Sequence, residues 1–316
     1  MKGEITCGVP QGSTLGPLLF LLYINDIANS VPTVKIHLFA DDTNFFISGK
    51  NIQNVISNCN DALAKLTDWL LANKLSLNTE KTCFSFFSRQ SLNDSEISIK
   101  VNKKEIKRVP NSKYLGVIID EDLTWAKHID FVKNKIIRFA GMLYKIRTLL
   151  SQSILRMIYF SMIYPHILYG IEIYANTFAK HLNPLIKANN RILRIIQNKP
   201  FRTHVQELYK NFNTLPINVL FQFQILKFMH KFNHFPNFLP TIYINYFTPN
   251  SSIHHHNTRS CNDLHQQSFK KSIGQRSIKN KGVKLWNSLP VELKTITNAN
   301  VFIRKVRMYL SKSEVV

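Results

Sequence analysis

The stretch that decides the fold of this chain is residues 34–48, which read VKIHLFADDTNFFIS. Apolar and polar residues alternate before residue 40, and an apolar run resumes after Asn44. Alternation with a period of two predicts β-strands, and the polar interruption between them predicts a tight hairpin. Asp41 and Asp42 then lie at the tip of that hairpin.

Two adjacent carboxylates at a hairpin tip can be interpreted in two ways. Neighbouring side chains on a straight strand point to opposite faces, so only a turn brings both carboxylates to one ion. A divalent cation would relieve their mutual repulsion, and Mg²⁺ prefers oxygen ligands of this kind. Aspartate is also common in turns for conformational reasons alone, so the pair by itself leaves an ordinary turn open.

A loop rich in glycine and proline precedes the hairpin. Residues 8–17 read GVPQGSTLGP, and the apolar segment LLFLLYINDI follows at residues 18–27. Glycines allow the backbone to lie close to a ligand, and a helix that starts after such a loop offers unpaired N–H groups to an anion. The sequence therefore predicts a loop and a helix suited to phosphate oxygens.

The remaining periodicity divides the chain into a mixed part and a helical part. Spacings of three and four residues predict one helix over residues 52–70. Short strands are predicted at 82–88, 97–101 and 114–119, and helices at 126–150, 153–163, 182–198, 217–232 and 301–310. The acidic run at residues 120–122 is interpreted as a solvated turn, and residues 233–280 as a looser connection. This order predicts an α+β fold, with helices packed on an antiparallel sheet and a mainly α-helical region behind them.

The charge is distributed unevenly along the chain. There are 41 Lys+Arg against 19 Asp+Glu, a net charge of +22, yet residues 1–100 carry 8 and 9 of these and residues 101–316 carry 33 and 10. An excess confined to one part favours a polyanionic partner such as nucleic acid, while ordinary solvated helices are the alternative. The 4 cysteines contain no C-x-x-C pair, which argues against a zinc knuckle or a disulfide scaffold.

Four ordered blocks resemble the reverse transcriptases of non-LTR (LINE-type) retrotransposons. They are the loop and helix at 8–27, FADD at 39–42, NKLSLNTEKT at 73–82 and KYLGV at 113–117. A weaker match is GVKLWNSLP at residues 282–290. The resemblance implies a partial polymerase palm over residues 1–119 and a basic helical thumb and C-terminal region over residues 120–316.

The resemblance also implies an activity and a set of site residues. The activity is RNA-directed DNA synthesis by two-metal nucleotidyl transfer, with Mg²⁺ (or Mn²⁺) as cofactor. Its partners are an RNA template paired with a DNA primer, and deoxynucleoside triphosphates. Asp41 and Asp42 would hold the metal as catalytic residues, and Lys81 would lie near the pyrophosphate, unless it is an ordinary surface lysine. The other implied positions are those of the nucleotide pocket, Pro10, Gln11 and Gly12, and of the primer grip, Tyr114, Leu115 and Gly116.

One required element is not found in the sequence. Polymerases of this kind need a third carboxylate from a strand before the GVPQG block, and only seven residues, with Glu4 as their one acid, precede Gly8. We therefore expect the C-terminal part of a retrotransposon polymerase, inactive by itself. The alternative is a non-catalytic, basic nucleic-acid-binding protein derived from a retrotransposon. We expect no signal peptide and no membrane span, hence an intracellular protein, and the resemblance implies the nucleus.

Overall fold

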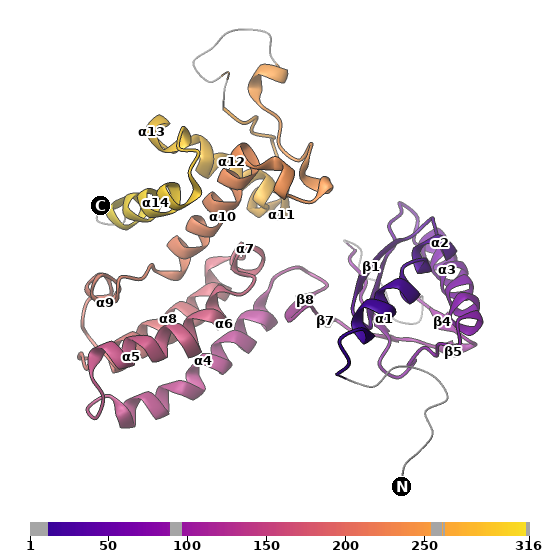
Figure 1. The fold of residues 1–316 in the computed structure, drawn as a ribbon, viewed down its shortest axis with the longest axis horizontal. Coiled ribbons are helices and arrows are strands. Elements are labelled where there is room, and N and C mark those ends of the chain that lie inside the picture. Colours follow the sequence, from indigo (N-terminus) through magenta and orange to yellow (C-terminus); the bar gives the residue numbers. More distant parts are fainter. Residues whose placement is uncertain (1–11, 89–96, 254–260, 262, 314–316) are drawn as a thin grey trace. The chain divides into compact units, whose positions relative to one another are not determined.

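The computed structural model describes residues 12–88, 97–253, 261 and 263–313. The chain divides into two compact units, Met1–Ser112 and Lys113–Val316. The first unit combines helices with short strands, and the second is almost entirely helical (Figure 1). This mixture of helix and sheet agrees with the predicted α+β class.

The first unit opens with two helices, a hairpin and one long helix. These elements are α1 (Gly16–Ile24), α2 (Ile27–Ser30), β1 (Lys35–Phe39), β2 (Asp42–Phe46) and α3 (Ile52–Ala72). β1 and β2 pair antiparallel with Phe39 opposite Asp42, which leaves a two-residue turn between them. Helix α3 begins where the Asn51 side chain accepts hydrogen bonds from the N–H groups of Gln53 and Asn54. The predicted hairpin and the predicted helix at 52–70 are confirmed.

The other strands of this unit are only two residues long. They are β3 (Cys83–Phe84), β4 (Lys100–Val101), β5 (Lys104–Glu105) and β6 (Lys107–Arg108). β4 pairs antiparallel with β5, but β3 pairs parallel with β6. The prediction of one antiparallel sheet is therefore wrong for the described residues, which form separate two-stranded ladders. The chain reverses at Asn102 and Lys103, both at positive φ, and this ends β4 early.

The core of the first unit is small. In the described part of this unit, ten buried hydrophobic side chains form it, contributed by α2, α3 and the region around β4, with Ile24 from α1. One face of the β1–β2 hairpin packs against this core through Ile36, Leu38 and Phe45.

The second unit begins within a hairpin that the sequence did not predict. β7 (Asn111–Tyr114) pairs with β8 (Val117–Asp120) across a turn made of Leu115 and Gly116. The prediction of one strand over residues 114–119 is therefore wrong. The turn residues have φ of 44° and 81°, so the backbone reverses there.

Helices form the rest of the second unit. They are α4 (Ala126–Ile146), α5 (Gln152–Ile158), the π-helix η2 (Tyr159–Ile163), α6 (Tyr164–Leu168), α7 (Ile171–Tyr174), α8 (Ala179–Ile196), α9 (Val205–Phe212), α10 (Ile217–His234), α11 (Ser272–Arg276), α12 (Ile278–Asn287), α13 (Val291–Lys294) and α14 (Ala299–Ser313). Short 3₁₀ turns occupy Pro236–Phe238, Thr241–Tyr243 and Asn250–Ser252. α4 lies along α8, while α12 and α14 pack on α10 (Figure 1).

The predicted long helices are confirmed, although several short ones were missed. α9 has eight residues, and α11 and part of α12 fall in the stretch interpreted as a looser connection. Fully buried side chains such as Ile136, Leu143, Leu185 and Ile192 join α4 to α8 in one continuous core. Over the residues that the structure describes, no helix combines the length and the apolar character needed to cross a bilayer.

Candidate functional site

The two candidate metal-binding carboxylates lie at the β1–β2 turn. Ala40 and Asp41 form this turn, and Asp42 is the first residue of β2. Ala40 has φ of +50°, in the left-handed region that is unfavourable for any residue with a Cβ atom. Both carboxylates are exposed. Backbone strain of this kind is often found at functional sites, where surrounding structure maintains it.

Asp42 belongs to the open face of the hairpin. Cross-strand pairing places Asp42 opposite Phe39 and Asn44 opposite His37, all on the face turned away from the core. Phe39 is 61% exposed, which is unusual for so large an apolar side chain. The hairpin therefore presents two carboxylates beside an exposed aromatic ring.

No residue that the structure describes neutralises either carboxylate. Among the residues that the structure describes, Asp41 and Asp42 take part in no ion pair and no side-chain hydrogen bond. The described ranges also contain no cluster of three or more His, Cys, Asp or Glu side chains suited to a metal ion. The donor set is thus two hard oxygen ligands, which suit Mg²⁺ when substrate phosphates and water complete its shell.

Only part of the predicted nucleotide pocket can be placed. Pro10 and Gln11 lie outside the described residues. Gly12 has φ of +89° with open space where a Cβ atom would stand, so glycine satisfies a conformational requirement there. The Ser13 hydroxyl accepts a hydrogen bond of 3.0 Å from the Gly16 N–H and fixes the entry into α1.

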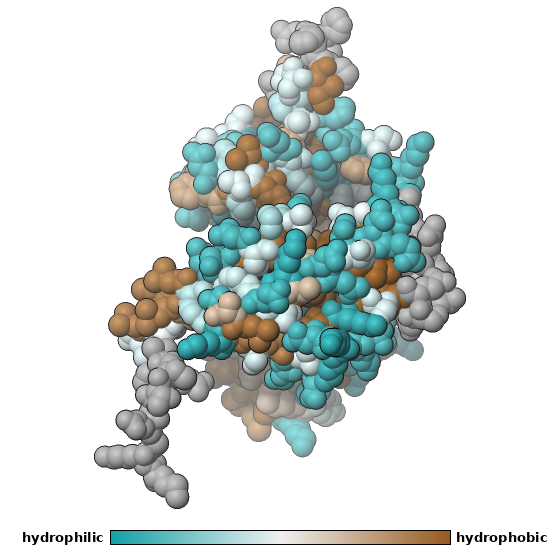
Figure 2. Space-filling model, turned by 90° about the vertical axis from the view of Figure 1, so that its right-hand side faces the viewer, coloured by the Kyte–Doolittle hydropathy of each residue, from teal (hydrophilic) through white to brown (hydrophobic). Residues whose placement is uncertain are grey.

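Helix α1 exposes an apolar surface. It buries Ile24 alone, while Leu18 is 55% and Leu22 is 69% exposed. On the face that Figure 2 shows, hydrophobic residues (brown) reach the surface among hydrophilic ones (teal). Contiguous exposed apolar residues are typical of surfaces that another molecule or segment covers.

Lys81 forms no ion pair with Asp41 or Asp42. It occupies a turn after α3, where its N–H donates to the Asn78 carbonyl and side-chain oxygens at 3.2 Å. Its side chain is exposed and forms no ion pair with any described residue. Its predicted role near the pyrophosphate stays a prediction.

The predicted primer grip is the tip of the β7–β8 hairpin. Tyr114 ends β7, and Leu115 and Gly116 make the turn with positive φ at both positions. The Tyr169 hydroxyl donates a hydrogen bond of 2.5 Å to the Leu115 carbonyl. A Cβ atom at Gly116 would stand 3.1 Å from the Tyr169 ring, so the close approach favours glycine. The tip is therefore a rigid turn attached to the end of α6.

Asp120 was misinterpreted from the sequence. Its side chain is buried rather than solvated, and its carboxylate accepts three hydrogen bonds. The donors are the Thr124 N–H at 2.8 Å, the Thr124 hydroxyl at 3.0 Å and the Trp125 N–H at 2.7 Å. Asp120 therefore anchors the entry into α4, where Trp125 adopts φ of +64°. The only signal in the sequence is an acid placed just before an amphipathic helix.

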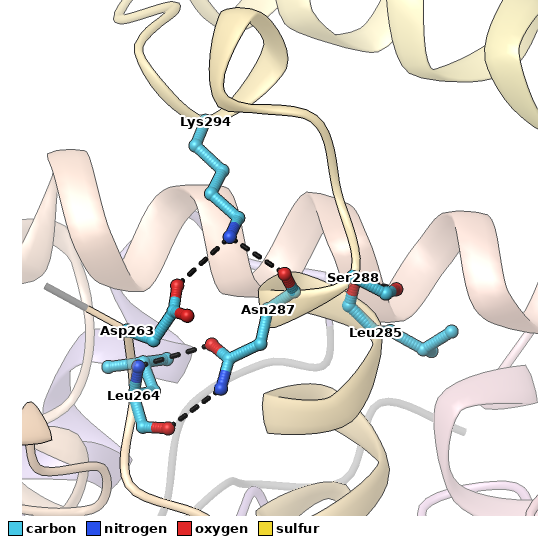
Figure 3. Close-up of polar contacts among 6 residues, drawn as sticks. All are labelled: Asp263, Leu264, Leu285, Asn287, Ser288 and Lys294. Carbon is cyan, nitrogen blue, oxygen red and sulfur yellow. Dashed lines mark hydrogen bonds and ion pairs between the residues drawn. The ribbon is translucent and has the colours of Figure 1, made fainter. Parts of the chain in front are cut away.

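The GVKLWNSLP segment has a structural role in the second unit. Figure 3 shows the Asn287 side chain accepting from the Leu264 N–H at 3.1 Å and donating to the Leu264 carbonyl at 2.8 Å. The Lys294 ammonium donates to Asp263 at 3.0 Å and to the Asn287 carbonyl at 2.8 Å. These contacts attach the segment before α11 to the end of α12.

Comparison with known proteins finds a family match over the first unit. Residues 2–119 match the family model of the reverse transcriptase (RNA-dependent DNA polymerase). Together with the relatives described next, this match confirms the resemblance to the reverse transcriptases of non-LTR (LINE-type) retrotransposons.

Individual relatives extend the similarity into the second unit. The chain is 27% identical over 246 residues to the RNA-directed DNA polymerase from mobile element jockey of Drosophila melanogaster, covering 74% of this chain and 26% of that protein. It is 26% identical over 205 residues to the probable RNA-directed DNA polymerase from transposon X-element of the same species, covering 61% and 22%. It is also 28% identical over 138 residues to the retrovirus-related Pol polyprotein from type-1 retrotransposable element R1 2 of Nasonia vitripennis, covering 41% and 33%.

The similarity covers only part of these relatives. The chain spans about a quarter of the length of the jockey and X-element polymerases. No solved structure matches it significantly.

Proposed function

We propose that this chain is part of an RNA-directed DNA polymerase of a non-LTR retrotransposon. Its substrates are an RNA template paired with a DNA primer, and deoxynucleoside triphosphates. The observation that carries this proposal is the exposed Asp41–Asp42 pair where the strained two-residue turn meets β2, within a segment that matches the reverse transcriptase family. We also propose a nuclear location, which a fluorescent fusion of the chain would test.

Asp41 and Asp42 are proposed as ligands of Mg²⁺ or Mn²⁺. Pairing of Phe39 with Asp42 fixes the turn, so the two carboxylates belong to adjacent residues at one end of the hairpin. A divalent ion bound there supplies electrostatic stabilisation of the charge that develops during nucleotidyl transfer. Lys81 would add positive charge for the leaving pyrophosphate, and the backbone at Pro10, Gln11 and Gly12 would line the nucleotide pocket.

The rest of the chain is proposed as a basic thumb. Residues 1–119 would form a partial palm, and residues 120–316 the thumb and C-terminal region. Support comes from the positive charge after residue 100 and from exposed rings next to cations. The Arg147 guanidinium lies 4.0 Å from the Tyr144 ring centroid, and that of Arg194 lies 5.5 Å from Phe201, which is 81% exposed. Cations bind phosphates and exposed rings stack on bases.

The β7–β8 tip is proposed to support the primer. Leu115 is exposed at the turn, and Tyr169 and Gly116 hold the backbone in one conformation. A rigid turn suits a positioning role, because small displacements of a primer end reduce the rate strongly.

A second candidate function is nucleic-acid binding without catalysis. The observation that favours it is the donor set of only two carboxylates among the described residues around the β1–β2 turn. Two-metal transfer needs further ligands to hold both ions, so we propose that the 316-residue polypeptide alone does not extend a primer.

The test is a primer-extension assay on two proteins with homopolymer RNA, a DNA primer and Mg²⁺. One protein is the 316-residue polypeptide, and the other is a chimera in which residues 1–316 replace the aligned portion of the jockey polymerase. We expect extension by the chimera only, reduced at least about 10²–10³-fold by Asp41→Asn with Asp42→Asn. Asp61→Asn on the exposed side of α3 is the matched control and keeps the activity.

Three outcomes separate the two functions. A chimera that extends primers regardless of Asp41 and Asp42 would contradict the proposed catalytic site. A chimera without activity whose second unit still binds RNA–DNA duplexes, with steep dependence on salt, would leave the non-catalytic function. Extension by the 316-residue polypeptide itself would contradict the proposed inactivity of this chain.

A further inference from the structure

The second unit contains a cavity whose polar lining consists mainly of hydrogen-bond donors and positive charge. It has a volume of about 310 Å³ and lies between the β7–β8 hairpin, α4 and α6. A water molecule occupies ~30 Å³, so the cavity has room for a ligand of several heavy atoms with solvent. Its polar side chains are Lys113, His128, Lys135, His166 and Tyr169, and no carboxylate lines it.

His128 contributes a buried donor without an acceptor. The side chain is 1% exposed, and the Ile118 N–H donates a hydrogen bond of 3.2 Å to its Nδ1. Because Nδ1 accepts, the proton of the neutral ring lies on Nε2. Burial and the charge of Lys135 lower the pKa of His128 to about 4, so this neutral form holds at pH 7. Nε2 is buried and has no partner among the described residues.

A buried donor without an acceptor is unusual in a folded protein. Buried polar groups are paired in the large majority of cases, because an unpaired one retains its full desolvation penalty. Phe131 and Tyr174 pack against the His128 ring, with centroid distances of 6.1 and 4.9 Å. The imidazole is therefore held in place, and no described residue supplies an acceptor for its Nε2–H.

Two lysines add positive charge around the same cavity. The ammonium groups of Lys113 and Lys135 lie 5.9 and 4.6 Å from the centroid of the Phe131 ring. Neither ammonium forms an ion pair with a described residue. Lys135 also lowers the pKa of His166 on the opposite wall, after the larger effect of burial. The cavity thus has a positive charge that no side chain of its lining balances.

We propose that this cavity binds a phosphate group, with the Nε2–H of His128 and the ammonium groups of Lys113 and Lys135 as donors. A phosphate offers several acceptor oxygens and negative charge, and both are what this lining lacks. Two sources share this chemistry: a phosphodiester of a nucleic-acid strand, and free phosphate or pyrophosphate. Only the first source rests on the proposed function.

The experiment follows the imidazole signals of the full chain, labelled with ¹⁵N-histidine, by nuclear magnetic resonance. The His128 signals are assigned as those lost in His128→Asn. Inorganic phosphate, pyrophosphate and a short DNA single strand are titrated separately at constant ionic strength. We expect a saturable shift of the His128 Nε2–H signal with at least one of the three. The strand as the best ligand identifies a backbone phosphate, and pyrophosphate or phosphate as the best ligand identifies a free anion.

Three variants keep the proposal falsifiable. Lys113→Met with Lys135→Met should weaken the affinity at least about tenfold, because charge-assisted bonds are lost. His128→Asn retains an acceptor for the Ile118 N–H but lacks the donor at Nε2, and should weaken phosphate binding followed at His166 about tenfold. Lys145→Met, an exposed lysine in the last turn of the same helix, is the matched control and should keep the affinity within about twofold.

Two results would overturn the proposal. The first is no saturable shift of His128 with any of the three probes, which would leave the cavity to water. The second is a shift that survives Lys113→Met with Lys135→Met at unchanged affinity. Inorganic phosphate is one of the probes, so phosphate binding can be detected even if the primer-extension assay fails. Conversely, a titration without phosphate binding leaves the polymerase proposal unaffected.

Discussion

The two units differ in the size of their hydrophobic cores and in how much of each matches a known family. Among the residues that the structure describes, the core of the first unit contains ten buried hydrophobic side chains and that of the second contains 41. Yet the family match falls mainly on the first unit, at residues 2–119. Within that range, Asp41, Asp42 and most of α1 are exposed, whereas the ten core side chains are buried. The difference indicates that the proposed site residues lie on the surface of the unit with the smaller core, whereas the second unit depends mainly on its larger apolar core.

The largest expected effect is a difference in stability between the units. Each well-buried large side chain contributes about 1.5–3 kcal/mol to the free energy of unfolding. The first unit, which has the smaller core, should therefore unfold first. We expect native-state hydrogen exchange of α3 amides to report a free energy of opening at least about 3 kcal/mol below that of α8 amides. Equal opening free energies in α3 and α8 would show that the two units unfold together, and would contradict the expected difference in stability.

The second effect is confined to the second unit. Asp120→Ala removes an acceptor of three hydrogen bonds and leaves the partly buried Thr124 N–H and the buried Trp125 N–H without a partner. We expect a loss of about 2–3 kcal/mol in the opening free energy of α4, with α3 unchanged. Asp122→Ala, at an exposed position two residues away, is the control and should change neither. A loss that appears equally in α3 would contradict the independence of the two units.

A smaller effect comes from pH. Burial and Lys135 lower the pKa of His128 from 6.5 to about 4, and no acid lines the cavity that His128 shares with Lys113 and His166. Below pH 6.5 the unfolded chain binds a proton that the folded one does not. The second unit should therefore lose about 2–3 kcal/mol at most as the pH falls from 6.5 to about 4. In His128→Asn, the opening free energy of α4, measured by hydrogen exchange, should depend less on pH. An unchanged pH dependence would contradict His128 as its source.

The smallest effect concerns the turn that carries the carboxylates. Ala40 holds φ of +50°, which glycine adopts without strain, at the expense of a larger loss of backbone entropy. Ala40→Gly should therefore stabilise the β1–β2 hairpin by about 0.5 kcal/mol, measured by exchange of its paired amides. Ala64→Gly, on the exposed side of α3, should have the opposite sign, a loss of about 0.5–1 kcal/mol. Destabilisation by Ala40→Gly would show that the turn is not strained.

Local patterns predicted part of this structure, and tertiary contacts decided the rest. The β1–β2 hairpin and α3 follow from alternation and helical spacing within their own residues. The β7–β8 turn does not, because Leu115 is a poor turn residue whose conformation depends on Gly116 and on the distant Tyr169. The burial of Asp120 depends on the packing around it in the same way.

The candidate site shows the same division. Asp41 and Asp42 could be selected because adjacent acids at a predicted turn are a local feature. The unpaired Nε2 of His128 could not, because it depends on Ile118 from β8 and on a cavity formed by three elements.

The central claim, that Asp41 and Asp42 together bind a divalent metal, has a direct measurement. Small amounts of Mn²⁺ added to the ¹⁵N-labelled chain broaden the amide signals near its binding site through paramagnetic relaxation. The account predicts that the amides of residues 39–43 broaden first, and that Asp41→Asn with Asp42→Asn abolishes this selectivity while the hairpin stays folded. Broadening that begins instead around Asp61 and Asp68 on α3, or that is unchanged in the double variant, would contradict it.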